Sequence, residues 1–258
     1  EIGRYAAENG IDAVVFNEDI TPAQQKNLEE VIPCKIIDRT RLILDIFAQR
    51  ARTKEGRLQV ELAQLNYLLP RLSGRGAAMM QQKGGIGMRG PGERKLEYDR
   101  RKIRKRIAKL EQDIESVQRE RSVRRGQRTA VPVPQVALAG YTNAGKSTLL
   151  NALTGRESAY ADDKLFATLD PTSRKVHFPS GINMVFTDTV GFIQKQPNGL
   201  VSAFRATLEE TKFADLVLHV ADASSDEIEE QASTVMSILN EINPEGGEIL
   251  RVFNKCDE

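Results

Sequence analysis

The sequence predicts an α/β protein in which a mostly parallel sheet follows a small α/β domain and an antiparallel helical hairpin. Three observations lead to this prediction. Apolar strands alternate with helical stretches after residue 132, two apolar stripes with heptad spacing flank a glycine-rich segment, and a strand–helix–strand pattern fills the start of the chain. We therefore expect three domains, at residues 1–45, 46–131 and 132–258.

The N-terminal domain is expected to be a parallel βαβ piece. Residues 11–16 and 35–38 have the composition of strands, and between them a helix is expected to begin at Pro22 with Thr21 as its N-cap. A helix between two strands is typical of a parallel pair, because parallel strands need a long crossover connection. We interpret the domain as lacking its start, and the chain as a fragment.

The middle section is expected to be a hairpin of two helices. Two stripes of apolar residues recur at steps of three, four or seven residues, before and after a glycine-rich break at 73–92. This spacing is typical of helices that pack as a coiled coil, so we interpret the stripes as core positions. The stripes are Leu58, Leu62, Leu65, Leu69 and Leu72, and then Leu96, Ile103, Ile107, Leu110, Ile114 and Val117.

Pro132 and Pro134 mark the predicted start of the third domain. Apolar strands there alternate with helices, so we expect a mostly parallel sheet that is covered on both faces. The predicted strands are 135–139, 175–178, 182–188, 216–222 and 249–254, and the predicted helices are 146–154, 200–211 and 226–240.

The net charge is +1, but positive and negative residues are unevenly distributed along the chain. Residues 1–70 carry a net charge of −2, residues 71–128 carry +11 and residues 129–258 carry −8. The basic section indicates a surface for a polyanion; the alternative is a solvated helix face laced with ion pairs. No apolar run is long enough to span a membrane, and two cysteines are too few for a disulfide framework and suit a reducing compartment.

The segment from Gly140 to Ser147 fits the pattern G-x-x-x-x-G-K-[ST] between a predicted strand and a predicted helix. Loops of this kind hold phosphate oxygens with their backbone N–H groups. The ammonium group of Lys146 is expected to reach the β- and γ-phosphates, and the hydroxyl of Ser147 is expected to bind Mg²⁺. The segment therefore predicts a site for a nucleoside triphosphate.

A second motif, Asp188-Thr-Val-Gly191, follows an apolar strand. An aspartate there can hold Mg²⁺ through water, and the N–H of Gly191 can sense the γ-phosphate. Between the two motifs, a threonine of the segment Phe166–Thr172 is expected to complete the Mg²⁺ shell, and Thr168 and Thr172 both qualify from the residues alone.

The segment Asn254-Lys-Cys-Asp257 ends the last predicted strand. The carboxylate of Asp257 can accept two hydrogen bonds from guanine, which adenine cannot donate, so we expect GTP and GDP as ligands. The stem of Lys255 can lie along the base. Phe192 follows Gly191 where many GTPases carry a water-orienting glutamine, so either hydrolysis is slow or another group or partner completes the site.

The candidate site residues fall into three groups. The metal candidates are Ser147, Thr168 and Asp188, and the catalytic candidates are Lys146, Gly191 and Asn143. The candidates for binding the nucleotide are Gly140, Tyr141, Thr142, Asn143, Ala144, Gly145, Lys146, Ser147, Phe166, Ala167, Thr168, Leu169, Asp170, Asp188, Thr189, Val190, Gly191, Asn254, Lys255 and Asp257.

These motifs, together with the glycine-rich run 84–93 and Asp99-Arg100-Arg101, resemble the HflX family of ribosome-associated GTPases, in the Obg–HflX class, over nearly the whole chain. The resemblance implies binding to the large ribosomal subunit and its rRNA, and a part in ribosome splitting or rescue under stress. It implies that Thr168 is the Mg²⁺ threonine, and it suggests a potassium ion at Asn143. We expect a cytoplasmic monomer with no DNA partner and no membrane span.

The chain departs from the family pattern in two places. Gln196 and Asn198 stand where the family usually has leucine and histidine around a proline, and the chain ends before the fifth guanine-contacting motif. Two other functions remain open: a GTP-controlled protein-interaction switch that uses the coiled coil, and a GTPase that takes part in tRNA modification. His177 and His219 are interpreted as structural, because no metal-ligand spacing accompanies them.

Overall fold

The computed structural model describes residues 1–72, 91–128, 133–155, 166, 168–193, 210–242 and 247–257. The chain forms two compact units, one of Glu1–Ala48 with Leu58–Glu115 and the other of Gln49–Arg57 with Ser116–Glu258. The glycine-rich run 84–90, most of the predicted helix 200–211, and Gln196 and Asn198 lie outside the described residues. The domain boundaries drawn from the sequence stay a prediction.

The first unit begins with the predicted βαβ piece. Helix α1 (Ile2–Glu8) precedes β1 (Ala13–Val15), α2 (Pro22–Val31) and β2 (Lys35–Ile37), and the two strands pair in parallel. Thr21 caps α2 in a capping box: its hydroxyl accepts from the amide of Gln24, whose side chain accepts from the amide of Thr21. The buried side chains of Ile20, Ile32 and Ile36 form the small apolar core of this piece.

Helix α3 (Arg39–Arg50) was not predicted from the sequence. Its buried residues are Thr40, Ile43, Leu44 and Phe47, which follow helical spacing. Strand β2 leads directly into α3 with only Asp38 between them, so the sequence carries no turn residues to separate the two elements.

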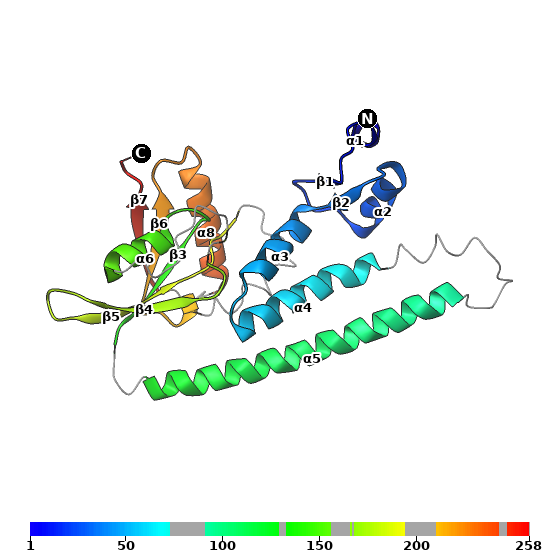
Figure 1. Ribbon diagram of the computed structural model, residues 1–258. Helices are drawn as coiled ribbons and strands as arrows, with labels where there is room; N and C mark the ends of the chain where they lie inside the picture. Colours follow the sequence, from blue (N-terminus) through cyan, green and yellow to red (C-terminus); the bar gives the residue numbers. More distant parts are fainter. Residues whose placement is uncertain are drawn as a thin grey trace. The chain divides into compact units, whose positions relative to one another are not determined.

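Helices α4 (Lys54–Arg71) and α5 (Pro91–Arg128) run side by side and antiparallel, as predicted (Figure 1). In the first unit Leu62, Leu110 and Ile114 form a buried cluster, against which Leu58, Leu65 and Ile107 pack. These residues belong to the two predicted stripes, so the heptad pattern identified the contact face. The guanidinium of Arg106 on α5 also donates a bidentate pair of hydrogen bonds to the carboxylate of Glu61 on α4, both at 2.7 Å.

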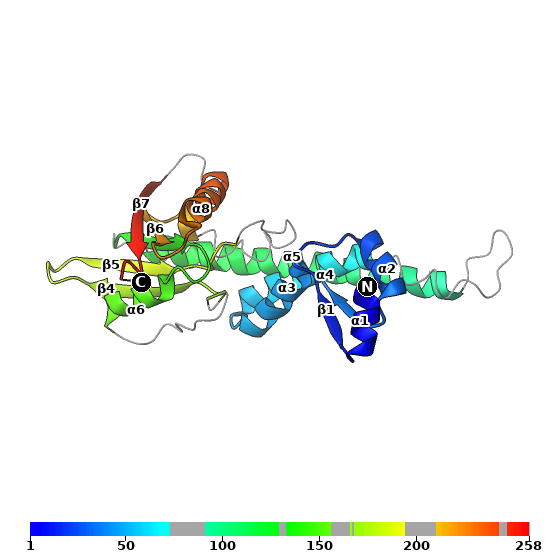
Figure 2. The same cartoon turned by 90° about the horizontal axis from the view of Figure 1, so that it is seen from above.

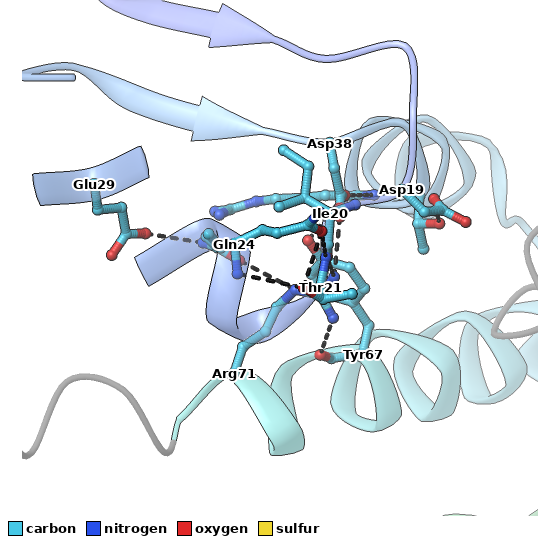
Figure 3. A network of polar contacts seen from close by, with 11 residues as sticks. Asp19, Ile20, Thr21, Gln24, Glu29, Asp38, Tyr67 and Arg71 are labelled. Carbon is cyan, nitrogen blue, oxygen red and sulfur yellow. Dashed lines mark hydrogen bonds and ion pairs between the residues drawn. The ribbon is translucent and has the colours of Figure 1, made fainter. Parts of the chain in front are cut away.

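A buried ion pair ties the end of α4 to Asp38, the residue between β2 and α3 (Figure 3). The carboxylate of Asp38 is 2% exposed and lies 3.0 Å from the guanidinium of Arg71. Asp38 also accepts hydrogen bonds from the hydroxyl of Tyr67 and the amide of Arg41, both at 2.8 Å. Burial and the hydrogen bond to Asp38 raise the pKa of Tyr67 well above its ordinary value.

The second unit holds a five-stranded sheet in the order β4-β5-β3-β6-β7. All neighbouring strands pair in parallel except β4, which is antiparallel to β5. The sheet is therefore mostly parallel, as predicted. The strands are β3 (Gln135–Gly140), β4 (Thr172–His177), β5 (Asn183–Asp188), β6 (Leu216–Asp222) and β7 (Glu248–Asn254).

Helices α6 (Lys146–Thr154) and α8 (Ile228–Ile242) lie on opposite faces of this sheet (Figures 1 and 2). Val136, Leu138 and Phe186 of the central strands pack with Leu150 of α6. The remaining face is covered by α8, whose Val235 is fully buried. None of the described helices is long and apolar enough to cross a membrane.

Candidate nucleotide site

The loop between β3 and α6 has the backbone shape that a phosphate-binding loop needs. Asn143 and Gly145 adopt left-handed conformations, with φ of 63° and 90°, and α6 begins immediately after Gly145. A Cβ atom on Gly140 would lie 2.3 Å from the carbonyl oxygen of Val220, so only glycine fits there. Tight packing against β6 thus explains Gly140, and the left-handed backbone explains Gly145.

Lys146 is buried at the centre of this loop, with 6% of its surface exposed. Its Nζ donates hydrogen bonds to the carbonyl oxygens of Gly140 and Tyr141, at 3.1 and 2.8 Å. Burial lowers the pKa of Lys146 to about 8, although the nearby carboxylate of Asp188 acts in the opposite direction. The hydrogen bonds of this buried ammonium group to described residues go to backbone carbonyl oxygens, so the group is suited to an anionic ligand.

Ser147, Thr168 and Asp188, the three metal candidates, lie together. The Oδ2 atom of Asp188 accepts hydrogen bonds from Ser147 Oγ at 2.6 Å and from Thr168 Oγ1 at 2.8 Å. The two hydroxyls are 3.0 Å apart. Thr172, the other threonine that qualified, instead directs its hydroxyl to the carbonyl oxygen of Asp170. The structure therefore brings together Ser147 and Asp188, which the motifs indicated, and Thr168, which the resemblance implied.

The cluster has the chemistry of a Mg²⁺ site, because hydroxyl and carboxylate oxygens are the ligands that this ion prefers. Asp188 is fully buried, and its Oδ1 atom has no hydrogen-bond partner among the described residues. Burial raises the pKa of Asp188, even though Lys146 and the hydrogen bonds from Ser147 and Thr168 lower it. The unpaired oxygen and the costly buried charge both fit a cation at this position.

The segment after β5 lies directly against the phosphate loop. A Cβ atom on Gly191 would be 2.7 Å from the Cα atom of Thr142, so this position has no room for a side chain. The amide of Phe192 donates to the carbonyl oxygen of Gly140, and the amide of Thr142 donates to that of Phe192. Phe192 is 1% exposed. The ring is packed in the interior and has no polar group that could position water.

Thr189 and Val190, between Asp188 and Gly191, are also buried. The hydroxyl of Thr189 donates to the carbonyl oxygen of Leu138 on β3. Both side chains therefore fix the segment to the sheet, and any contact of theirs with a nucleotide would run through the backbone.

The residues at the end of β7 close the site from the other side. The side-chain amide of Asn254 donates to the carbonyl oxygen of Ala144 at 2.9 Å, and a Cβ atom on Gly145 would lie 2.0 Å from that amide nitrogen. Lys255 has a φ of 56°, and its Nζ lies 2.8 Å from Asp222 Oδ2. Asp257 follows with an exposed side chain.

Sequence reasoning did not identify Asp222. Burial acts to raise the pKa of Asp222, but hydrogen bonds from Lys255 and Ser224 outweigh it and lower the pKa. The signal that could have identified it is its position at the carboxyl end of β6, opposite Asn254 at the end of β7. The ion pair with Asp222 fixes the side chain of Lys255, whose stem was predicted to lie along the base.

The segment from Phe166 to Asp170 is only partly brought to the site. Phe166 and Leu169 are each 4% exposed and anchor the segment on either side of Thr168, while Ala167 lies outside the described residues. The carboxylate of Asp170 does not join the hydroxyl cluster; it binds the backbone amides of Arg52 and Thr53. Asp170 is therefore placed differently from its expected role beside the nucleotide.

A five-stranded sheet with a phosphate loop, a buried hydroxyl–carboxylate cluster and the motif Asn254–Asp257 at the end of its edge strand defines the class of P-loop GTPases. Three sequence families match the chain: "GTP-binding GTPase N-terminal" at residues 1–48, "GTP-binding GTPase Middle Region" at 50–128 and "50S ribosome-binding GTPase" at 135–255. Together they account for nearly all of the sequence.

Curated relatives define the family. GTPase HflX of Caldanaerobacter subterraneus subsp. tengcongensis is 53% identical over 257 residues, and GTPase HflX of Escherichia coli is 49% identical over 257 residues. Each alignment covers 100% of the chain and 60% of the relative, so the chain spans about 60% of their length. The chain belongs to the HflX family of GTPases.

A solved structure is similar along the whole chain. It is a GTP-binding protein from the archaeon Sulfolobus solfataricus in complex with GDP, with a TM-score of 0.53 and 27% sequence identity. The alignment covers 100% of this chain and 68% of that protein.

Proposed function

We propose that the protein binds GTP and GDP with Mg²⁺ and hydrolyses GTP. The observation that carries this proposal is the cluster of Ser147, Thr168 and Asp188 beside the buried Lys146. The two hydroxyls and the carboxylate, the latter through water, would hold Mg²⁺, which supplies charge neutralisation for the phosphates when it is bound. The GDP complex of the Sulfolobus protein supports guanine nucleotides as the ligands.

The chain's own residues account for binding and for charge stabilisation. The loop amides before α6 and the ammonium group of Lys146 would hold the phosphates and offset the charge that develops as water attacks in line. Asp257, exposed at the end of β7, would read the base, and the N–H of Gly191 would contact the γ-phosphate. Because Phe192 is buried, we expect slow hydrolysis until a partner, or a potassium ion at Asn143, completes the site.

We further propose that the partner is the large ribosomal subunit and that α5 contributes to its binding. Arg101, Lys105 and Lys109 are exposed on α5, whereas Leu110 and Ile114 of the same helix are buried in the hairpin. An exposed row of cations on one helix face suits the phosphates of folded RNA, which proteins recognise largely by shape and backbone. The description "50S ribosome-binding GTPase" of the matched family supports the same partner. We propose that the protein acts there as a cytoplasmic monomer in ribosome splitting or rescue.

The test measures GTP hydrolysis by the full-length protein, alone and with purified large subunits, at matched Mg²⁺ and K⁺. We expect strong stimulation by the subunits and co-sedimentation that weakens steeply with salt. A triple charge reversal of Arg101, Lys105 and Lys109 to glutamate should abolish both. The matched control reverses three exposed cations of the N-terminal elements, Arg4, Lys26 and Lys35, and should leave both unchanged. Equal behaviour of the two triple variants would reject α5 as the contact.

A protein-interaction switch is the second candidate, and one observation favours it. Tyr98 and Val123 of α5 are 67% and 62% exposed, which offers apolar contact points to a protein. Treatment with RNase separates the two functions, because a complex with a protein partner should survive it and a complex with rRNA should not.

A further inference from the structure

The first turn of α4 is capped by a residue from a distant part of the chain. Thr53 precedes the helix, and its hydroxyl accepts a hydrogen bond from the amide of Gly56 at 3.0 Å. The carboxylate of Asp170 accepts from the amides of Arg52 and Thr53, at 2.7 and 2.9 Å, and from the hydroxyl of Thr53 at 2.5 Å. All of these residues belong to the second unit. A carboxylate at this end of a helix is also favoured by the helix dipole.

Asp170 takes the place that a local side chain occupies in an ordinary capping box. In α2 the third helical residue, Gln24, accepts from the amide of the N-cap Thr21. In α4 the third helical residue is Gly56, which has no side chain to do so. A Cβ atom on Gly56 would lie only 2.2 Å from Asp170 Oδ1. The glycine therefore leaves the space into which Asp170 inserts.

Asp170 lies two residues after Thr168, whose hydroxyl joins the cluster with Ser147 and Asp188. Leu169, between them, is 4% exposed. The segment 168–170 is thus attached at one end to the proposed metal site and at the other to the first turn of α4. Three residues span at most about 10 Å, so a displacement of either end is passed to the other.

The first turn of α4 has further support that does not depend on Asp170. Glu55 in this turn lies 3.4 Å from the guanidinium of Arg121, which also pairs with Glu210. The turn is therefore a fixed anchor for Asp170. Loss of the Asp170 contact should release the segment 168–170 without unfolding the helix.

We propose that Asp170 is a positioning residue for Thr168: by capping α4 it holds the threonine hydroxyl at the metal site, and it leaves α4 when Thr168 leaves that site. This inference rests on the proposed nucleotide function. Because equilibrium coupling is reciprocal, changes at Thr53 or Gly56 must alter the binding of a Mg²⁺–GTP complex, although neither residue belongs to the nucleotide site.

The decisive variant is Gly56→Gln in the full-length protein. A glutamine there gives α4 a local capping box like that of α2 and displaces the Asp170 carboxylate. Helix propensity and the new cap should raise the melting temperature or leave it unchanged. The measured quantity is the dissociation rate of a fluorescent, slowly hydrolysed GTP analogue, with excess Mg²⁺ and with EDTA.

With Mg²⁺ present, we expect dissociation from Gly56→Gln to be about fivefold to tenfold faster than from the wild type, which corresponds to a loss of about 1–1.4 kcal/mol in the hold on Thr168. With EDTA the two rates should agree. Asp170→Asn should show the same loss of Mg²⁺ dependence but a lower melting temperature. Thr21→Ala, which removes the cap of α2, should lower the melting temperature alone.

A merely structural role for Asp170 predicts that Gly56→Gln, with its intact cap, dissociates at the wild-type rate in Mg²⁺. Rates within twofold of each other would overturn the inference while nucleotide binding itself stood. Failure of the wild-type protein to bind the analogue at all would overturn the proposed function and the inference together.

Discussion

Replacing Arg71 with methionine is expected to destabilise the first unit by about 3 kcal/mol, at the low end of the range for a broken buried ion pair. This estimate follows from the groups that lose a partner when the guanidinium is removed. Asp38 keeps the hydroxyl of Tyr67 and the amides of Ile20 and Arg41, but its buried charge loses the guanidinium that forms its salt bridge. The carbonyl oxygen of Ile20, 2.5 Å from the guanidinium, also loses that donor.

Methionine keeps the apolar stem of the arginine, so the loss is mostly electrostatic. The guanidinium also lies 3.6 Å from the centre of the Tyr67 ring, a cation–π contact that the variant removes. For a chain of this length, about 3 kcal/mol corresponds to a fall of about 6–12 °C in melting temperature.

The assay is thermal and urea unfolding followed by circular dichroism. Asp38→Asn in the Arg71→Met background should restore part of the stability, because a neutral amide needs no counter-ion. Arg4→Met, which removes an exposed arginine 3.9 Å from Glu8, is the control and should not shift the midpoint. A cost below about 1 kcal/mol for Arg71→Met, or strictly additive effects in the double variant, would refute the reasoning.

Three further predictions concern the second unit. Burial, followed by the charges of Arg251 and Lys146, lowers the pKa of His219 to about 4. As the pH falls, the imidazole therefore becomes protonated in the unfolded chain before it does so in the folded protein. The free energy of unfolding should fall as the pH is lowered from 6.5 toward 4, by up to about 2 kcal/mol at pH 5. In urea titrations, His219→Leu should show a shallower fall. Gly191→Ala would bring a Cβ atom 2.7 Å from the Cα atom of Thr142, so nucleotide release, measured by stopped-flow fluorescence, should accelerate at least severalfold. Asp257→Asn should weaken GTP binding by about a hundredfold or more and favour xanthosine nucleotides, as competition titrations would show, because an amide donates where the carboxylate accepts; an unchanged guanine preference would contradict the proposed base contact.

The features that the sequence predicted well have local causes. The phosphate loop was recognisable because the left-handed backbone at Gly145 and the buried lysine are encoded within a few residues of one another. Strand β6 was predicted with its observed bounds because its run is apolar and central in the sheet. Strand β4 begins at Thr172, earlier than the predicted residue 175, because an edge strand alternates polar and half-buried residues and lacks that apolar signal.

The features that were missed depend on contacts between distant segments. Asp170 was expected beside the nucleotide, and its partner Thr53 lies 117 residues away, which no local pattern indicates. The basic section shows the same limit. Its arginines include Arg106 and Arg121, which form ion pairs with acidic residues of α4, whereas Arg101 and Lys105 are exposed. A count of charges in the sequence cannot distinguish the arginines that form ion pairs from the exposed cations.

The hydrogen bond from Asn254 to Ala144 has a consequence for the order in which the protein is made. The two residues are 110 positions apart, so at ordinary rates of translation roughly 5–20 s pass between their synthesis. During that interval the phosphate loop lacks the amide that supports it, and the parallel strand β7 has not yet joined β6. A nascent chain should therefore acquire high affinity for nucleotide only after β7 has emerged from the ribosome and docked.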